Sequence, residues 1–331
     1  MNPRAIWPDY RGWRMVAALA ITEPVSWGVL YYAFSALIVP MQRELGWSLA
    51  ELTAGFSLAT LVAGLAAIPA GRWVDRRGGR ALMTAASLLA VAMTLAWSRI
   101  ETLPVFLAVW AGIGLAQAGT LYEPAFASVA PWFRRYRSRA WLIITITAGF
   151  ASTIFLPLTG WLAGRHGWRE SLVILAVLLA AVTVPLHAVV LRRRPEDFGL
   201  LPDGERPIPL PDGDPAPLPP LEGATMGEAL RDPGFWWLAA GFWLATIVSI
   251  AAGVHFIPYL TERGESPAFA AAAAGAIGAA QVLARLVVTA LGGRLSLMRI
   301  TAGVFLLQAV SVLLMLAGGR ASIVLAVLLL G

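Results

Sequence analysis

The chain has 331 residues, of which 58% are hydrophobic and only 13% are charged, and its mean hydropathy is +0.72. Soluble globular domains carry about 25% charged residues, so this composition excludes a water-soluble enzyme and a disordered chain. The absence of cysteine excludes a secreted module that disulfides hold together.

Apolar runs fill most of the sequence. A bilayer core about 30 Å thick needs roughly 20 apolar residues in a helix, and nine runs reach that scale. The first is no cleaved signal peptide, because it is too long and contains Glu23 and Pro24. A tenth run stops halfway, so we expect a fragment or a truncated reading frame. The ten predicted helices are 13–41, 49–70, 81–98, 103–132, 140–163, 171–191, 235–260, 267–291, 300–317 and 321–331.

The net charge of +6 comes from arginine, since the sequence contains no lysine. With the N-terminus placed inside, alternating helices put 18 arginines in inside segments and 6 in outside loops. This bias predicts a cytoplasmic N-terminus. It also accounts for the basic charge without a nucleic-acid partner.

A Pro-rich segment divides the chain. We predict an N-terminal six-helix bundle over 1–192, a cytoplasmic linker over 193–232, and an incomplete C-terminal bundle over 233–331. Proline at this density favours extended, solvated backbone, and residues 225–231 are expected to form a short surface helix. A shift of 221 residues aligns the starts of the halves, and parallel half-repeats are a recurrent plan in secondary transporters.

The predicted loop at residues 71–80 reads Gly-Arg-Trp-Val-Asp-Arg-Arg-Gly-Gly-Arg. We expect Gly71 to let helices approach closely, Asp75 to cap a helix or pair with an arginine, and Gly78 and Gly79 to allow a tight turn. The segment resembles the G-x-x-x-D-R-x-G-R-R loop of the major facilitator superfamily and departs from it at Gly79.

That resemblance implies an all-α membrane protein of the major facilitator fold. It has two six-helix halves, with about nine and a half of twelve helices present here. The loop is expected to act as a conformational latch between the halves. Its latch residues would be Gly71, Asp75, Arg76, Gly78 and Arg80.

Finer similarity points to the monocarboxylate-porter and oxalate/formate-antiporter branch. It rests on residues 27–34, 122–126, 194–204 and 255–264. The resemblance implies alternating-access transport of a small mono- or dicarboxylate, by proton coupling or exchange. It also implies a monomer in a bacterial-type inner membrane.

Arg285 lies near the middle of the predicted helix 267–291. An arginine there costs roughly 2.5–3.5 kcal/mol on membrane-insertion scales, so it should face a polar cavity. In such a cavity it can bind a carboxylate through two parallel hydrogen bonds. The resembling branch carries a substrate-binding arginine in this helix. Monocarboxylate porters often have an Asp four residues earlier, but Gln281 stands here and lies on the same helix face. A structural ion pair with a membrane carboxylate is the alternative role of Arg285.

Several other polar residues lie in apolar runs. Glu23, Glu123 and His255 are the candidates for proton coupling, although each also fits a structural role. His187 and His255 are more typical of satisfied structural histidines. Three hydroxyl groups, which are those of Tyr31, Tyr32 and Tyr122, are candidate donors to a substrate carboxylate.

Other functions compete with this interpretation. A drug or neutral-solute exporter is disfavoured by the resemblance, because drug–proton antiporters of that superfamily typically have a Gly-Pro pair in the fifth helix and residues 148–160 contain none. A non-transporting receptor or scaffold and an inactive truncated product remain alternatives. The sequence shows no phosphate-binding loop, no metal-ligand spacing and no nucleophile with a base, so we expect neither an enzyme nor a cofactor or metal.

Overall fold

The computed structural model describes residues 10–204 and 225–330, except 266–268, 270–272, 274–275, 278–279, 282, 286 and 289–294. Throughout these residues the regular structure is helical and no strand occurs. The chain forms two compact units, Met1–Ala216 and Pro217–Gly331. The boundary lies in the Pro-rich segment, while the finer division at 192 and 232 stays a prediction.

The first unit begins with one continuous span, Arg11–Leu45. It consists of α1 (Arg11–Trp27), a π-helical turn η2 (Gly28–Tyr32) and α2 (Ala33–Leu45). Gly46, at φ 71°, ends α2 in the left-handed region that favours glycine. Helix α3 (Leu49–Arg77) starts with a capping box, in which Ser48 and Glu51 bond each other's backbone amides.

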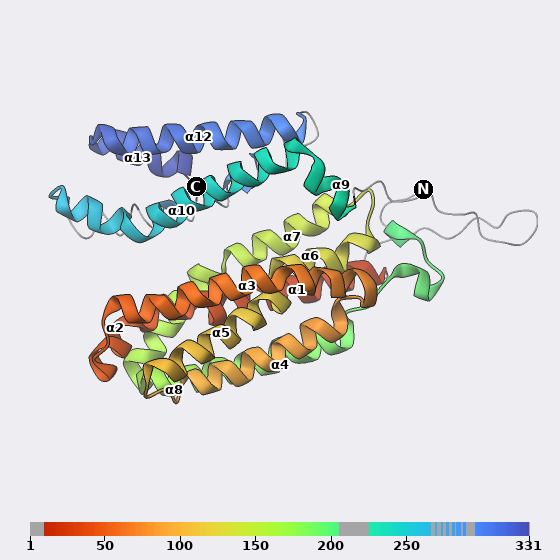
Figure 1. Ribbon diagram of the computed structural model, residues 1–331, viewed down its shortest axis with the longest axis horizontal. Helices are drawn as coiled ribbons and strands as arrows, with labels where there is room; N and C mark the ends of the chain where they lie inside the picture. Colours follow the sequence, from red (N-terminus) through yellow and green to blue (C-terminus); the bar gives the residue numbers. More distant parts are fainter. Residues whose placement is uncertain are drawn as a thin grey trace, which may run out of the picture. The chain divides into compact units, whose positions relative to one another are not determined.

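The rest of the first unit returns through five further helical pieces (Figure 1). The predicted helix 103–132 is broken at Leu121, because Pro124 fits only the first turn of a new helix. The predicted loop between 163 and 171 is reduced to a turn at Gly167, whose φ is 80°. The pieces are α4 (Gly79–Trp97), α5 (Leu103–Thr120), α6 (Tyr122–Val129), α7 (Arg137–Gly149) and α8 (Ala151–Val190).

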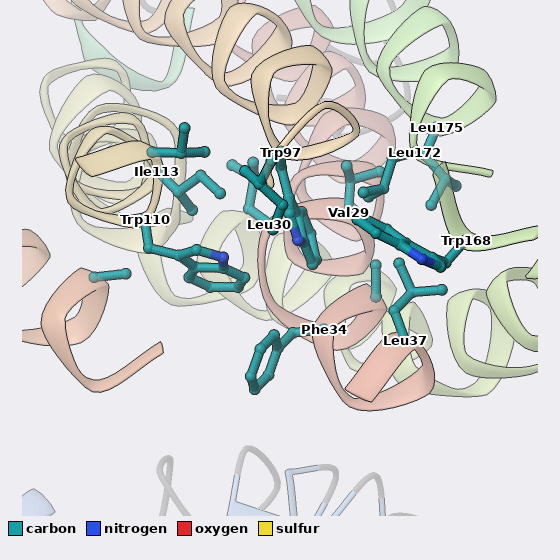
Figure 2. Packing of buried hydrophobic residues seen from close by; sticks show 14 of the residues in the cluster. Val29, Leu30, Phe34, Leu37, Trp97, Trp110, Ile113, Trp168, Leu172 and Leu175 are labelled. Carbon is teal, nitrogen blue, oxygen red and sulfur yellow. The ribbon is translucent and has the colours of Figure 1, made fainter. Parts of the chain in front are cut away.

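Helix pairs α3–α5, α4–α8 and α4–α5 form the main contacts of this unit. Small residues allow the closest approaches: the backbone of α3 at Ala59 lies against Gly114, and the Phe155 ring lies where a side chain on Gly28 would be. Apolar residues from α1 to α8 fill the core, among them Leu30, Trp97 and Trp110 (Figure 2). Burial of this apolar surface stabilises each helix against its neighbours.

The segment after α8 packs back onto the first unit through η4 (Pro195–Phe198) and η5 (Pro202–Gly204). Asp203, at φ 64°, accepts hydrogen bonds from the backbone amides of Arg134, Arg135 and Tyr136 at 3.1, 2.8 and 3.3 Å. The Tyr10 hydroxyl donates to the Trp132 carbonyl at 2.6 Å. Burial, and then the charge of Asp203, raise the pKa of Tyr10, so this phenol stays protonated.

The second unit contains α9 (Met226–Arg231), α10 (Pro233–Glu262), α12 (Leu297–Ala317) and α13 (Arg320–Leu330). The expected surface helix is confirmed as α9, which Thr225 and Glu228 cap reciprocally. Gln308 on α12 donates to the Ala245 carbonyl of α10 at 2.9 Å. The predicted helix 267–291 falls largely outside the described residues.

Seven helices among the described residues are long and apolar enough to cross a membrane. The all-helical fold class is therefore confirmed, and the chain is an integral membrane protein. The predicted side of each loop stays a prediction, as does the full number of helices.

Candidate functional site

Helix α1 is irregular where its polar residues lie. Pro24 lacks the amide hydrogen that a helix interior needs. One turn later the backbone widens into the π-turn, in which Ala33 N–H donates to the Gly28 carbonyl. π-turns are rare and often mark functional sites. This turn carries two of the predicted substrate residues, Tyr31 and Tyr32.

Aromatic rings join this turn to the break between α5 and α6. Trp27 lies 5.3 Å from Tyr31 and 5.1 Å from Tyr122, measured between ring centroids. Tyr31 lies 5.2 Å from Tyr32 and 4.9 Å from Phe56 on α3. The structure thus brings Tyr31, Tyr32 and Tyr122 into one cluster, which we call the aromatic cluster together with Trp27 and Phe56. All five side chains are partly buried.

Glu23 lies one turn before Trp27 and is fully buried. Neither of its carboxyl oxygens accepts a hydrogen bond. The indole Nε1 of Trp27 is likewise buried without an acceptor, so it makes no hydrogen bond with Glu23. Glu123 on α6 is exposed, and its charge reaches Glu23. The two predicted proton-coupling carboxyl groups are therefore electrostatic neighbours beside the aromatic cluster.

The remaining predicted binding residues belong to the second unit. Arg285 is helical and half-buried, and it takes part in an interaction within the structure. Gln281, one turn earlier, is exposed. His255 lies on α10, and its side chain is outside the described residues.

The predicted latch at 71–80 is corrected in several respects. Most of it is helical: Gly71, Asp75 and Arg76 belong to α3, and Arg80 belongs to α4. Only Gly78 makes the turn, at φ 77°, whereas Gly79 starts α4. A side chain on Gly71 would meet nothing within 4 Å in the first unit, so its expected role in close helix approach is wrong there. Asp75 is exposed, and no side chain caps α4.

His187 is confirmed as a satisfied structural residue. On α8 it is fully buried, with Nδ1 2.8 Å from Ser87 Oγ and Nε2 3.0 Å from Thr22 Oγ1. It thereby ties α8 to α4 and α1.

Sequence analysis missed two residues of this site, Trp27 and Gln117. Gln117 on α5 is buried and donates through Nε2 to the Leu30 carbonyl in the π-turn at 2.9 Å. Its signal was available, because a glutamine inside an apolar run must find a partner. No cluster of three or more His, Asp or Glu side chains that could hold a metal occurs among the described residues.

A broken helix pair, a buried carboxyl group and clustered aromatic hydroxyls inside an all-helical membrane unit are features of solute carriers. The family model of the Major Facilitator Superfamily matches residues 20–331. The chain therefore belongs to this superfamily, which confirms the fold class and the expectation that it is no enzyme.

Curated proteins with a similar sequence include the following two. An uncharacterized 38 kDa protein in the 23S RNA operon of Thermoproteus tenax is 26% identical over 250 residues, which are 75% of this chain and 58% of that protein. Monocarboxylate transporter 11 of Mus musculus is 27% identical over 277 residues, 78% of this chain and 54% of that one. The chain thus spans somewhat more than half the length of both relatives.

Solved structures share the fold. The fucose:proton symporter FucP of E. coli matches with a TM-score of 0.64 and 14% identity over 95% of this chain and 80% of that one. A bacterial homolog of the human lysosomal transporter Spinster, inward-facing and unoccupied, matches with a TM-score of 0.60 and 19% identity. That match covers 98% of this chain and 73% of the homolog.

Proposed function

We propose that this protein is a secondary active transporter that moves a small mono- or dicarboxylate across the membrane by alternating access. The observation that carries the choice of an anion is Arg285, a half-buried guanidinium within an apolar run. A guanidinium matches a carboxylate with two parallel hydrogen bonds. The relation to monocarboxylate transporter 11 supports the same substrate class.

Gln281 and the three tyrosines would orient the substrate. Gln281 lies one turn from Arg285, and the hydroxyls of Tyr31, Tyr32 and Tyr122 can donate to a carboxylate. His255 remains a further proton-coupling candidate. We place the carrier in a bacterial-type inner membrane, with the N-terminus and the linker on the cytoplasmic side. We expect it to act as a monomer, with residues 71–80 as its latch.

Glu23 is the leading candidate for coupling to protons. A buried carboxyl group without a partner is tolerated mainly in its neutral form, so Glu23 can take up a proton in one state and lose it when water or a cation reaches it. Glu123 would tune this exchange, because two nearby negative charges disfavour each other. Exchange of one anion for another would need no such step.

The test is counterflow in liposomes that contain the full chain, preloaded with unlabelled lactate or oxalate and given the labelled anion outside. Arg285→Ala is expected to abolish counterflow. Arg285→Lys is expected to retain only part of it, because lysine lacks the planar guanidinium group that makes two parallel hydrogen bonds. Arg299→Ala, on the exposed face of α12, is the matched control.

The alternatives predict other results. A drug or neutral-solute exporter would keep transport in Arg285→Ala and lose it in Glu23→Gln. A receptor or scaffold would bind the anion without counterflow. If Glu23 carries the proton, Glu23→Gln should keep anion exchange but lose accumulation driven by a pH gradient.

A further inference from the structure

Gln117 connects the two irregular turns of the candidate site. Its side-chain Nε2 donates to the Leu30 carbonyl in the π-turn at 2.9 Å. The backbone carbonyl of Gln117 accepts a hydrogen bond from the backbone amide of Leu121 at 3.0 Å, where α5 ends and α6 follows. Gln117 is 5% exposed and Leu30 1%, so water does not compete for the bond between them.

The π-turn decides where Tyr31 and Tyr32, its last two residues, lie. A π-turn contains one more residue than an α-helical turn, and each helical residue turns the chain by about 100°. If η2 closed as an α-helix, the residues that follow would therefore face a different side. The observed turn places Tyr31 against both Trp27 and Phe56.

The break at Leu121 has the same effect on α6. Leu121 is extended, with φ −87° and ψ −161°, and Tyr122 begins the new helix. Tyr122 there lies against Trp27. Gln117 therefore bonds to the π-turn that contains Tyr31 and Tyr32 and to Leu121, which precedes Tyr122. It lies outside the aromatic cluster itself.

We propose that Gln117 is a positioning residue of the substrate site, which acts through the Leu30 carbonyl to hold the π-turn and so sets the directions of Tyr31 and Tyr32 relative to Tyr122. The inference rests on the proposed function, because it assigns the tyrosines to substrate orientation. It adds a residue that neither charge nor family motif marks.

Gln117→Leu tests this role, since leucine fills similar space without a donor. Gln308→Leu is the control in the second unit, because it removes an amide-to-carbonyl bond to Ala245 together with a bond to Ser249. Both variants should lose some thermal stability. Only Gln117→Leu is expected to raise the KM of lactate counterflow, by about fivefold to tenfold, the change expected for one lost hydrogen bond. It should also speed hydrogen exchange at the Ala33 amide, which closes the π-turn.

Gln117→Glu gives a readout that a general packing role would not move. A protonated glutamate can donate to the Leu30 carbonyl, whereas a carboxylate cannot. The ratio of its KM to the wild-type value should therefore lie near one at low pH and rise as pH increases.

The outcomes separate the two proposals. Suppose that the wild type shows counterflow. If the KM of Gln117→Leu is then unchanged, or if both leucine variants change KM equally, the positioning role alone is overturned. Unchanged Ala33 exchange overturns it as well. Absence of counterflow from the wild type overturns the proposed function and this inference with it, even if Ala33 exchange responds to Gln117→Leu.

Discussion

The guanidinium Nε of Arg169 lies 2.7 Å from Oε1 of Glu44, and the pair joins the end of α2 to the turn in α8. The other nitrogens of Arg169 donate to the carbonyls of Ser98 and Ile100, both at 2.9 Å. Ser98 is the C-cap of α4, where a helix leaves acceptors unpaired, and Ile100 lies in the loop between α4 and α5. The Arg169 side chain therefore bonds α8 to the end of α2 and to the α4–α5 connection.

Arg169→Ala should lower the unfolding free energy of the first unit by about 2 kcal/mol, most of it from the lost carbonyl bonds. The ion pair itself contributes little, since its side chains are 33% and 49% exposed. Thermal unfolding in detergent measures the change. Arg165→Ala, an exposed arginine nearby, is the control. Equal stability of the two variants would contradict the prediction.

His187→Leu is expected to destabilise the protein by about 2 kcal/mol or more, because the buried Ser87 hydroxyl loses its partner and the Thr22 hydroxyl keeps only its 3.5 Å bond to the Leu19 carbonyl. The triple variant His187→Leu, Ser87→Ala, Thr22→Val should regain part of that loss, since no polar group is then left unpaired. His166→Ala is the exposed control. A triple variant less stable than His187→Leu would count against this account.

Asp203→Gly should speed hydrogen exchange at the amides of Arg134, Arg135 and Tyr136, whose common acceptor is removed. Glycine tolerates the positive φ at this position, so the variant tests the bonds without backbone strain. Asp203→Ala should show the same exchange and a further loss of stability from strain. Asp197→Ala, exposed on η4, should leave the three amides unchanged.

Gly114→Ala should destabilise by about 1–3 kcal/mol, because its new Cβ would press on the α3 backbone at Ala59 and force the helices apart. Gly64→Ala is the matched control, since no atom lies within 4 Å of that Cβ. The control should be neutral or stabilise by up to about 1 kcal/mol through helix propensity. Thermal unfolding compares the two, and a similar response from both would refute the proposed close contact.

Hydropathy alone predicted the helices of the first unit, because each must cover roughly the thickness of a bilayer. It could not predict where they break. The π-turn at Gly28–Tyr32 accepts, at the Leu30 carbonyl, a hydrogen bond from Gln117, which is 87 residues away in sequence. Likewise, the sequence of residues 71–80 does not show which glycine makes the turn. In the structure Gly78 alone makes it, and Gly79 starts the next helix.

The candidate site was predicted as a set of residue types rather than as an arrangement. Polar residues in apolar runs identified Glu23 and the tyrosines, and the structure gathers Tyr31, Tyr32 and Tyr122 around Trp27. Trp27 was noted only within the stretch 27–34 that resembles the branch and was not predicted as a site residue, because a tryptophan in an apolar run is usually a packing residue. The roles of Arg285 and Gln281 stay predictions.

The Phe155 ring occupies the volume that any side chain on Gly28 would need. The two positions therefore share one fixed volume across the interface of η2 and α8. A larger residue at 28 should be accepted only together with a smaller one at 155, so relatives are expected to change the two positions as a pair. An engineer who wishes to reshape the π-turn would have to begin on the other helix, at Phe155.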